Sequence, residues 1–233
     1  SEIRTQTDVL IHLAQSAHFR DFPGKAVDVF QVNTVSTLKL IDWALKNQVK
    51  QFIYASSGGV YTPGQGPVPE SQDIVYQSKK GFYIATKHCS EVLLDNYASL
   101  LPVIQLRFFF IYGKQQQKNM LIPRLVNNVK NKIPITLDGY SGMKINPVHV
   151  DDAAQAISAC FGLKESEKFN IGGPEILSIR DISETIGNLL GVPPEFMIND
   201  KPAENLIGDI QKMCTSLWVP KVRFKEGVQE LIP

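Results

Sequence analysis

Tyr83 and Lys87 are the pair of side chains in this sequence best suited to acid–base chemistry. Residues four apart on a helix share one face, so their side chains meet. A lysine ammonium beside a phenol favours the phenolate and lowers the pKa of the tyrosine, which can then act as a base or an acid. Ser57 lies upstream, in the run Phe52-Ile-Tyr-Ala-Ser-Ser57, where its hydroxyl would polarise the same substrate oxygen.

This tyrosine–lysine spacing occurs at three places, so its context has to select among them. The three pairs are Tyr76/Lys80, Tyr83/Lys87 and Tyr140/Lys144. The third pair encloses Gly142 and indicates a turn, and the first runs into Gly81 and indicates a loop. The second pair opens a long helical pattern of apolar residues. The spacing alone leaves open that this second pair is only an exposed helix start.

The composition is that of an ordinary globular protein. The chain has 233 residues, of which 43% are hydrophobic and 20% charged. Its 24 lysines and arginines are balanced by 23 aspartates and glutamates, so binding to nucleic acid or a membrane surface has no electrostatic support. No apolar stretch approaches the ~20 residues that span a bilayer.

The cysteines and histidines indicate neither a disulfide framework nor a metal site. Cys89, Cys160 and Cys214 are widely spaced, and no histidine stands at a metal-binding spacing from them. Three scattered cysteines are typical of reduced thiols in a cytoplasmic protein.

The first half of the chain alternates strand and helix patterns. Residues 9–14, 51–56 and 103–111 are apolar runs that predict buried strands. Residues 27–47 and 83–101 predict the helices between them. This alternation is typical of a parallel α/β sheet with right-handed crossovers.

The pattern changes after Gly113. We expect helices over 119–131, 150–161 and 179–190, a last short helix near 225–231, and strands near 135–137, 145–148 and 169–171. Ser178 and Asp181 predict the N-terminal cap of the third helix, and Gly191 predicts its end.

Seven short motifs follow one another between about Asp8 and Asp209. They are Asp8-x-Leu-Ile-His-Leu-Ala14, Asn33-x-x-x-Thr37-x-x-Leu40, Phe52-Ile-Tyr-Ala-Ser-Ser57-x-x-Val-Tyr61, Tyr83-x-x-x-Lys87-x-x-x-Glu91, Leu106-Arg107-x-x-x-x-Tyr112-Gly113, Val148-His-Val-Asp-Asp-Ala153 and Phe169-Asn-Ile-Gly-Gly173. Each motif is weak alone. In this order and at these spacings, the chain resembles the extended short-chain dehydrogenase/reductases, the NAD-dependent epimerase/dehydratase group.

The resemblance implies an α/β fold with a Rossmann-like parallel sheet and a smaller C-terminal α/β substrate domain. We assign residues 1–113 to a partial NAD(P)-binding domain that lacks the N-terminal strands. We assign residues 114–233 to a substrate-binding domain, with parts near 146–173 returning to the first sheet.

The resemblance also selects among the three pairs, because only Tyr83/Lys87 has the family's Ala-Thr before the lysine and Glu91 four residues after it. It implies that Tyr83 is the catalytic acid/base, that Lys87 lowers its pKa and binds the nicotinamide ribose, and that Ser57 takes the catalytic Ser/Thr position. The residues implied to contact NAD or NADP are Leu13, Ala14, Gln15, Ser16, Asn33, Ser56, Lys87 and Phe109.

The Gly-rich loop with which this family cradles the pyrophosphate has no counterpart in the sequence, and Gly58-Gly59 and Gly172-Gly173 lack its context. In the family's strand order, the strand at residues 9–14 lies beside the absent first strand, so we expect its edge to be bare. We therefore expect the chain to be a piece of a longer protein, short of roughly 60 residues at about 30 per strand–helix unit.

Several positions depart from the sugar-nucleotide enzymes of the family. Gly58 and Gly59 replace the Asp-Glu pair of the 4,6-dehydratases, Phe110 replaces a common asparagine, and the diphosphate-binding arginines near Ile145 and Leu206 are absent. The segment from Asn146 to Asp152 is closer to the reductase-like members.

The resemblance implies an NAD(P)-dependent epimerase or oxidoreductase of the sugar-nucleotide type. Two alternatives stay open: an NADPH-dependent carbonyl reductase-like enzyme, and a non-catalytic homologue that binds a partner. The helices at 27–47 and 83–101 are similar to the pair through which the family often forms homodimers. Simple packing of these helices on the sheet is the competing interpretation.

We predict that this polypeptide alone binds NAD(P) poorly, because the Gly-rich loop is absent from its sequence. Isothermal titration calorimetry on a preparation whose intact mass matches 26.0 kDa measures this affinity directly. Submicromolar binding in that preparation would show the prediction to be wrong.

Overall fold

The computed structural model describes residues 6–75 and 81–232, so the Tyr76/Lys80 pair and its predicted loop lie outside the described residues. The chain forms two compact units. The first comprises Ser1–Thr62, Asp73–Arg107 and Ile157–Phe169, and the second comprises Pro63–Gln72, Phe108–Ala156 and Asn170–Pro233.

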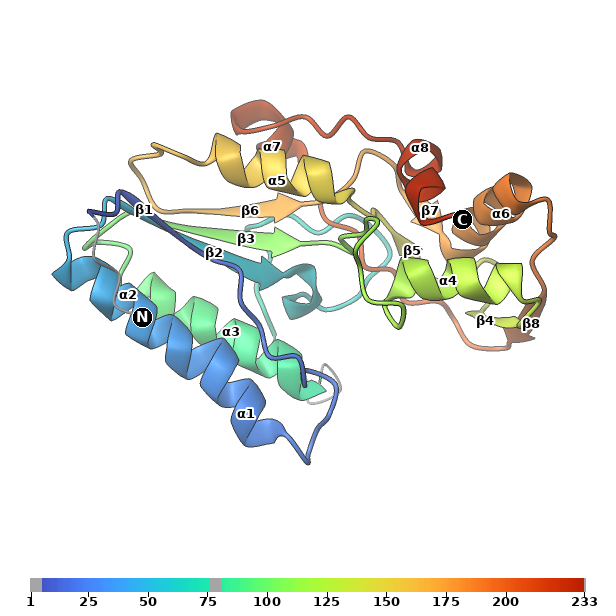
Figure 1. The fold of residues 1–233 in the computed structure, drawn as a ribbon, viewed down its shortest axis with the longest axis horizontal. Coiled ribbons are helices and arrows are strands. Elements are labelled where there is room, and N and C mark those ends of the chain that lie inside the picture. The colour runs from blue at the N-terminus through green and yellow to red at the C-terminus, as the bar shows by residue number, and fades with distance from the viewer. Residues whose placement is uncertain (1–5, 76–80, 233) are drawn as a thin grey trace. The chain divides into compact units, whose positions relative to one another are not determined.

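A four-stranded sheet forms the centre of the first unit. Its strands are β1 (Val9–His12), β2 (Gln51–Ser57), β3 (Val103–Phe108) and β6 (Glu167–Ile171), in the order β1-β2-β3-β6. β1 and β2 pair in parallel, and the arrows of β2, β3 and β6 point the same way in Figure 1. The predicted α/β class with a parallel sheet is confirmed.

Helices cover one face of this sheet (Figure 1). They are α1 (Ala26–Phe30), α2 (Ser36–Lys46) and α3 (Gly81–Asp95). The apolar side chains of α2 and α3 meet those of the strands in one buried cluster that includes Ile41, Phe52 and Leu94. Burial of these side chains fixes the two helices against the sheet.

The helix predicted over residues 27–47 is not one regular α-helix. A π-helical segment, η1 (Gln31–Val35), separates α1 from α2. Single π-helical turns inside α-helices occur frequently at functional sites. Asn33, a predicted cofactor residue, lies at the centre of this segment.

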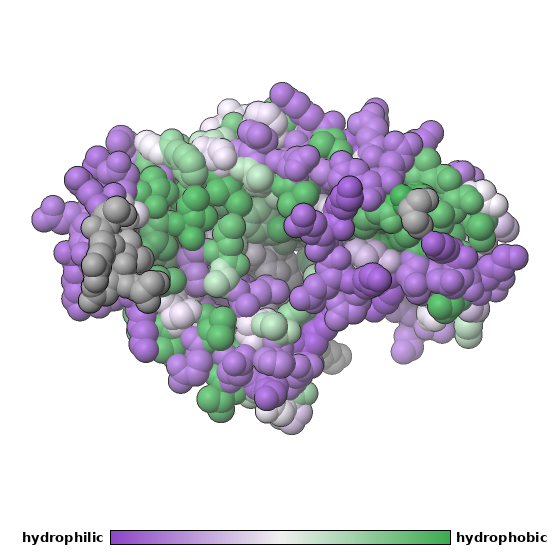
Figure 2. Space-filling model, in the orientation of Figure 1, coloured by the Kyte–Doolittle hydropathy of each residue, from purple (hydrophilic) through white to green (hydrophobic). Residues whose placement is uncertain are grey.

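β1 forms one edge of the described sheet and pairs with β2. Its inward side chains Leu10 and His12 are buried, whereas Ile11 and the following Leu13 are 40% and 53% exposed. Figure 2 shows hydrophobic residues gathered in patches among hydrophilic ones on this view of the molecule. Because β1 is terminal in the strand order and pairs with β2 on one side, the expected bare edge is present within the described residues.

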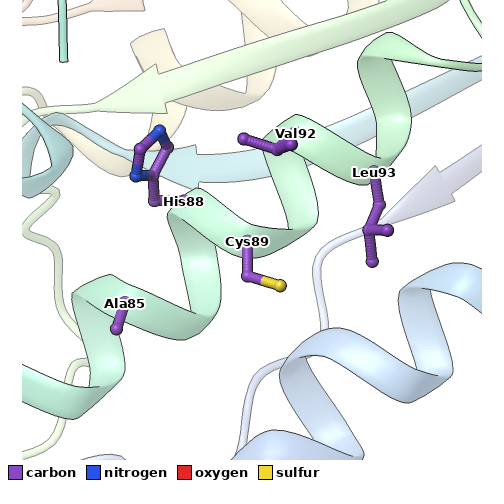
Figure 3. A pocket seen from close by; sticks show the side chains of 5 residues that line it. All are labelled: Ala85, His88, Cys89, Val92 and Leu93. Carbon is purple, nitrogen blue, oxygen red and sulfur yellow. The ribbon is translucent and has the colours of Figure 1, made fainter. Parts of the chain in front are cut away.

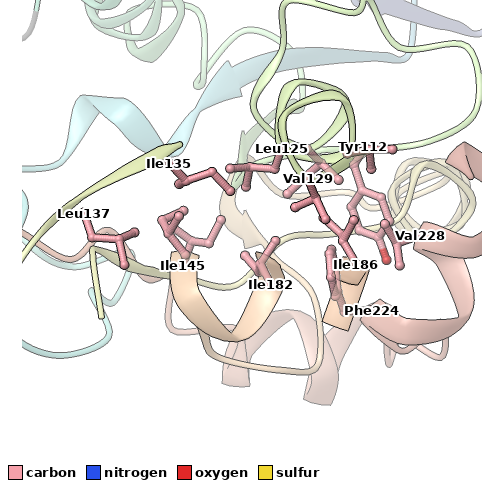
Figure 4. Packing of buried hydrophobic residues seen from close by; sticks show 13 residues of the cluster. Tyr112, Leu125, Val129, Ile135, Leu137, Ile145, Ile182, Ile186, Phe224 and Val228 are labelled. Atoms are coloured by element: carbon pink, nitrogen blue, oxygen red, sulfur yellow. The ribbon is translucent and has the colours of Figure 1, made fainter. Parts of the chain in front are cut away.

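The second unit contains short strands and helices around its own core. Its helices are α4 (Leu121–Lys130), α5 (Val150–Ala159), α6 (Ile179–Leu190), α7 (Gln211–Ser216) and α8 (Phe224–Val228). Its strand pairs are β4 (Ile135–Asp138) with β8 (Phe196–Asn199), and β5 (Lys144–Ile145) with β7 (Leu177–Ser178). Figure 4 shows residues of the buried cluster at its centre, among them Leu125, Ile145, Ile182 and Phe224.

Buried polar contacts stabilise two places in the second unit: the start of α6 and the segment that follows α7. Ser178 and Asp181 form the predicted capping box of α6, and Gly191 ends the helix with a φ of 66°. Asp152 in α5 is 3% exposed and accepts hydrogen bonds from the Trp218 indole and from the backbone amides of Lys221 and Val222. This buried carboxylate fastens the C-terminal segment to α5.

The strand predicted at 145–148 is shorter than expected, because pairing with β7 ends at Ile145. β8 and α7 were not expected from the sequence, because they are short and lack a strong apolar period. No helix within the described residues combines the length and the apolar composition that crossing a membrane requires.

Candidate active site

Tyr83 lies in the first turns of α3, where it contacts the segment that follows β1. Its phenol donates a hydrogen bond to Oε1 of Gln15, 3.0 Å away, and its ring centroid lies 5.2 Å from that of Phe19. Burial raises the pKa of Tyr83 to about 12, against a smaller lowering by hydrogen bonding to Ser57. Tyr83 is therefore a neutral phenol at physiological pH in this structure.

Ser57 ends β2 and begins a short 3₁₀ segment, η2 (Gly58–Val60). Its Oγ accepts a hydrogen bond from the Gly59 amide, 3.1 Å away. A Cβ at Gly59 would lie 2.5 Å from Cδ1 of Ile84 on α3, so a side chain here would require the flexible end of Ile84 to move. The turn after Ser57 thus packs closely against the helix that carries Tyr83.

Lys87 is buried one helical turn after Tyr83, with 2% of its surface exposed. Its Nζ donates to the carbonyl oxygen of Ala55 at 2.8 Å and lies 5.0 Å from the centre of the Tyr54 ring. Burial lowers the pKa of Lys87 from 10.5 to about 8, and the charge of Glu91 acts in the opposite direction. The ammonium is thus charged at neutral pH but costly to bury.

Asn33 connects three segments around the pair. Its Oδ1 accepts from the Ser16 amide at 2.9 Å, and its Nδ2 donates to Oγ1 of Thr86 at 3.0 Å. Its backbone carbonyl accepts from the Ser90 hydroxyl at 2.9 Å. These bonds join the segment after β1, the π-helical turn and α3 next to Lys87.

The remaining predicted cofactor residues occupy different environments. Leu13, Ala14 and Gln15 follow β1 and are exposed. Ser56 is buried and donates to Glu91 at 2.5 Å. Phe109 belongs to the second unit, where it is 1% exposed and packs so closely that a Cβ at Gly208 would lie 2.6 Å from its ring. Their contacts with a cofactor stay predictions.

Three residues that the sequence analysis did not single out take part in the site. His12 on β1 is buried, and burial together with the charge of Lys87 lowers its pKa to about 4, so it is neutral. Thr86 holds Asn33, and Arg107 on β3 pairs with Glu91. Thr86 and Arg107 both belong to the sequence motifs described above. Their hydrogen-bond and ion-pair partners, Asn33 and Glu91, are far away in the sequence and are identified only by the fold.

The first unit thus gathers a phenol, a serine hydroxyl and a buried ammonium at the carboxyl end of β2, beside the end of β1. Ligands of open α/β sheets bind outside this end of the strands. The exposed segment Leu13–Gln15 leaves backbone and side chains available along β1, and Lys87 has donors beyond the one given to Ala55. These residues fit the nicotinamide end of a dinucleotide.

A parallel sheet with helices packed on it, in this arrangement, is that of the dinucleotide-dependent enzymes built on a Rossmann-like sheet. The family model described as "NAD dependent epimerase/dehydratase family" matches residues 2–172. The chain belongs to that family, as its motifs indicate.

Known proteins resemble the chain over most of its length. The uncharacterized UDP-glucose epimerase YtcB of Bacillus subtilis (strain 168) is 27% identical over 230 residues, which cover 95% of this chain and 72% of the relative. The dTDP-4-dehydro-6-deoxyglucose reductase of Escherichia coli is 28% identical over 210 residues, covering 80% and 62%. The crystal structure of UDP-glucuronic acid 4-epimerase from Bacillus cereus in complex with NAD aligns with a TM-score of 0.83 at 25% identity, covering 96% and 71%.

We predict that replacing the buried lysine, Lys87→Met, stabilises the fold while removing its chemistry. The folded pKa of Lys87 lies below its ordinary value, so the folded chain binds fewer protons than the unfolded chain between about pH 8 and 10.5, and stability rises with pH across that window. Below pH 8 the buried charge is a cost. The variant should gain about 2 kcal/mol in free energy of unfolding at pH 7.

Urea unfolding of the wild type and of Lys87→Met, at pH 7 and between about pH 8 and 10.5, measures the difference in free energy of unfolding. The variant should also lack the part of the pH-dependent rise that Lys87 causes. Lys50→Met is the matched control, because the Lys50 side chain is 71% exposed and its ion pair with Asp8 lies at the surface. A Lys87→Met protein less stable than the wild type at pH 7 would contradict the buried-charge account.

Proposed function

We propose that the protein is an NAD-dependent epimerase that acts on a sugar nucleotide, with Tyr83 as acid/base assisted by Ser57 and Lys87. The observation that carries this proposal is the burial of the Lys87 ammonium one helical turn after Tyr83, whose phenol donates a hydrogen bond to Gln15 beside the end of β1. Membership of the family and the likeness to proteins named as UDP-sugar epimerases support it.

Each residue has a distinct role in the proposed reaction. Tyr83, as phenolate, accepts the proton of the sugar hydroxyl that is oxidised, and Ser57 donates a hydrogen bond to the same oxygen as it becomes a carbonyl. Lys87 supplies positive charge that favours the phenolate. When bound, NAD would accept a hydride from the sugar carbon and supply it again to the other face. Tyr83 would then return the proton to the oxygen.

In this proposal, the protonated, Gln15-bound Tyr83 of this structure is the resting form of the enzyme. Its pKa of about 12 keeps the proton on the phenol, where it is shared with Gln15. For catalysis near neutral pH, the phenol has to leave Gln15 and the positive charge of Lys87 has to act on it. The ammonium, held on the Ala55 carbonyl, has further donors for that purpose.

We assign cofactor binding to residues 1–113 and substrate binding to residues 114–233, with parts near 146–173 returning to the first sheet, as β6 does. A cleft of about 740 Å³ within the second unit supports the second assignment. Arg124 and Lys201 line it together with Asp138 and Glu204. The two cations are suited to a diphosphate, in place of the family arginines missing near Ile145 and Leu206.

A reductase is the second candidate. Gly58, Gly59 and Phe110 depart from the pattern of the sugar-nucleotide epimerases and dehydratases. Phe110 adopts a φ of 46°, a region in which asparagine is far more common than a bulky residue. An epimerase leaves NAD unchanged over a full cycle, whereas a reductase consumes the reduced cofactor, so net change in absorbance of the nicotinamide separates them.

We predict that Tyr83→Phe lowers turnover about 10²- to 10⁴-fold, because the variant keeps the ring and loses the proton-transfer group. The protein produced from its complete coding sequence is incubated with NAD and UDP-glucose or UDP-glucuronate, and the epimers are separated by chromatography. Cofactor affinity, measured by calorimetry, should stay within a few-fold of the wild type. Turnover equal to the wild type would remove Tyr83 from the mechanism.

We also propose that the protein forms a homodimer through the outer face of α3. Figure 3 shows Ala85, Cys89 and Val92 among the side chains that line a shallow apolar pocket on this helix. The same unit exposes Val27 and Phe30 on α1 by 75% and 41%. A second copy would cover such a face, as the family resemblance implies, whereas a monomer would leave it in water.

We predict that Val92→Glu converts a dimer into a monomer, because it places a charge in the apolar face. Light scattering coupled to size-exclusion chromatography gives the mass of each species. Val219→Glu is the matched control, since Val219 is 56% exposed and Val92 51%, and Val219 lies in the second unit. A wild-type protein that is monomeric at high micromolar concentration would rule out this interface.

We place the protein in the cytoplasm. Cys89, Cys160 and Cys214 form no disulfide within the described residues. Burial raises the pKa of the Cys160 thiol to about 12, which keeps it protonated and unreactive. Cysteines that form no disulfides are typical of a reducing compartment.

A further inference from the structure

A buried ion pair lies directly behind the candidate active site. Glu91 stands one turn after Lys87 on α3, and Arg107 lies near the end of β3. Nη2 of Arg107 donates to Oε2 of Glu91 at 2.7 Å, and Nε donates to Oε1 at 3.1 Å. The Glu91 side chain is 1% exposed and the Arg107 side chain is 3% exposed. Two parallel bonds between a guanidinium and a carboxylate fix the orientation of both groups.

The pair contacts both ends of the turn that carries Ser57. Oε1 of Glu91 accepts a hydrogen bond from the Ser56 hydroxyl at 2.5 Å, immediately before Ser57. Nη1 of Arg107 donates to the phenol oxygen of Tyr61 at 2.5 Å, and its guanidinium lies 4.8 Å from the centre of that ring. Tyr61 directly follows η2. Glu91 thus fixes the start of the turn at Ser56, and Arg107 fixes its end at Tyr61.

Glu91 also brings a negative charge to the side of Lys87. The other titratable groups around this ammonium are His12 on β1, Tyr54 on β2, Tyr83 on α3 and, behind Glu91, Arg107 on β3. His12 is neutral because of its lowered pKa, and burial raises the pKa of Tyr54 so that it stays protonated. Of these groups, Glu91 supplies the charge that opposes the desolvation of Lys87.

We propose that Glu91 is the positioning residue of this site: its carboxylate holds the turn that presents Ser57 and keeps the Lys87 ammonium charged at working pH. The inference rests on the proposed roles of Tyr83 and Lys87. It goes beyond them because one carboxylate, which touches no substrate, sets both the position of Ser57 and the charge of Lys87. A purely structural ion pair between α3 and β3 would have neither effect.

The charge of Lys87 is measured by ¹³C NMR titration of lysine labelled at Cε, with the Lys87 signal assigned by its loss in Lys87→Arg. This measurement needs no turnover, so it stands even if the proposed function fails. We expect Glu91→Gln to lower the pKa of Lys87 by roughly one unit or more, and Glu91→Asp to restore most of the wild-type value. An unchanged Lys87 titration in folded Glu91→Gln would overturn the charge role.

Glu91→Gln leaves Arg107 buried without its partner, so this variant can fail to fold. The double variant Glu91→Leu/Arg107→Met replaces the pair with apolar side chains of similar volume, a change that proteins often tolerate. It should lower the pKa of Lys87 as well, because the negative charge nearer the ammonium is lost. A Lys87 titration in the double variant equal to that of the wild type also contradicts the proposal.

Ser56→Ala tests the hold on the serine turn separately. It removes the hydrogen bond to Glu91 and leaves the carboxylate in place, so the Lys87 titration should not move. In the protein produced from its complete coding sequence, kcat should fall about tenfold, with KM for the sugar substrate within twofold of the wild type. Unchanged kcat would remove the positioning role, and a matching loss of NAD affinity would make Ser56 a cofactor contact instead.

Discussion

The structure of the site depends on the burial of one ammonium group, that of Lys87, against the end of β2. A charged group in this position is costly to desolvate, and its cost is offset by the Ala55 carbonyl, the face of the Tyr54 ring and the charge of Glu91. Tyr83, one turn earlier, is placed by the same helix. A chain optimised for stability alone would bury an apolar side chain here, so the lysine is best explained by chemistry.

The helix α3 positions the surrounding segments because its successive turns contact three of them. Tyr83 contacts Gln15 after β1, and Thr86 contacts Asn33 in the π-helical turn. Ser90 also bonds the Asn33 carbonyl, and Glu91 bonds Ser56 on β2. Four polar side chains on one face of a single helix thus set the positions of the groups that would meet a cofactor and a substrate.

The sequence predicted the elements with long apolar runs, because burial in a parallel sheet leaves a strong pattern at β1, β2 and β3. It also selected Tyr83/Lys87 through the residues around the pair. It did not predict the π-helical segment at Asn33, since one extra residue in a turn barely changes the helical period. Nor could it predict the bonds of Glu91 to Ser56 and Arg107, which join residues far apart in the chain.

The most direct measurement is an ultraviolet difference titration of Tyr83, taken as the wild type minus Tyr83→Phe, in the protein produced from its complete coding sequence. Without NAD, the pKa of Tyr83 should lie near 12. With saturating NAD it should fall toward about 7, and Lys87→Met should prevent the fall. A phenol that still titrates near 12 in a NAD-bound, catalytically active protein would contradict the assignment of Tyr83 as the acid/base.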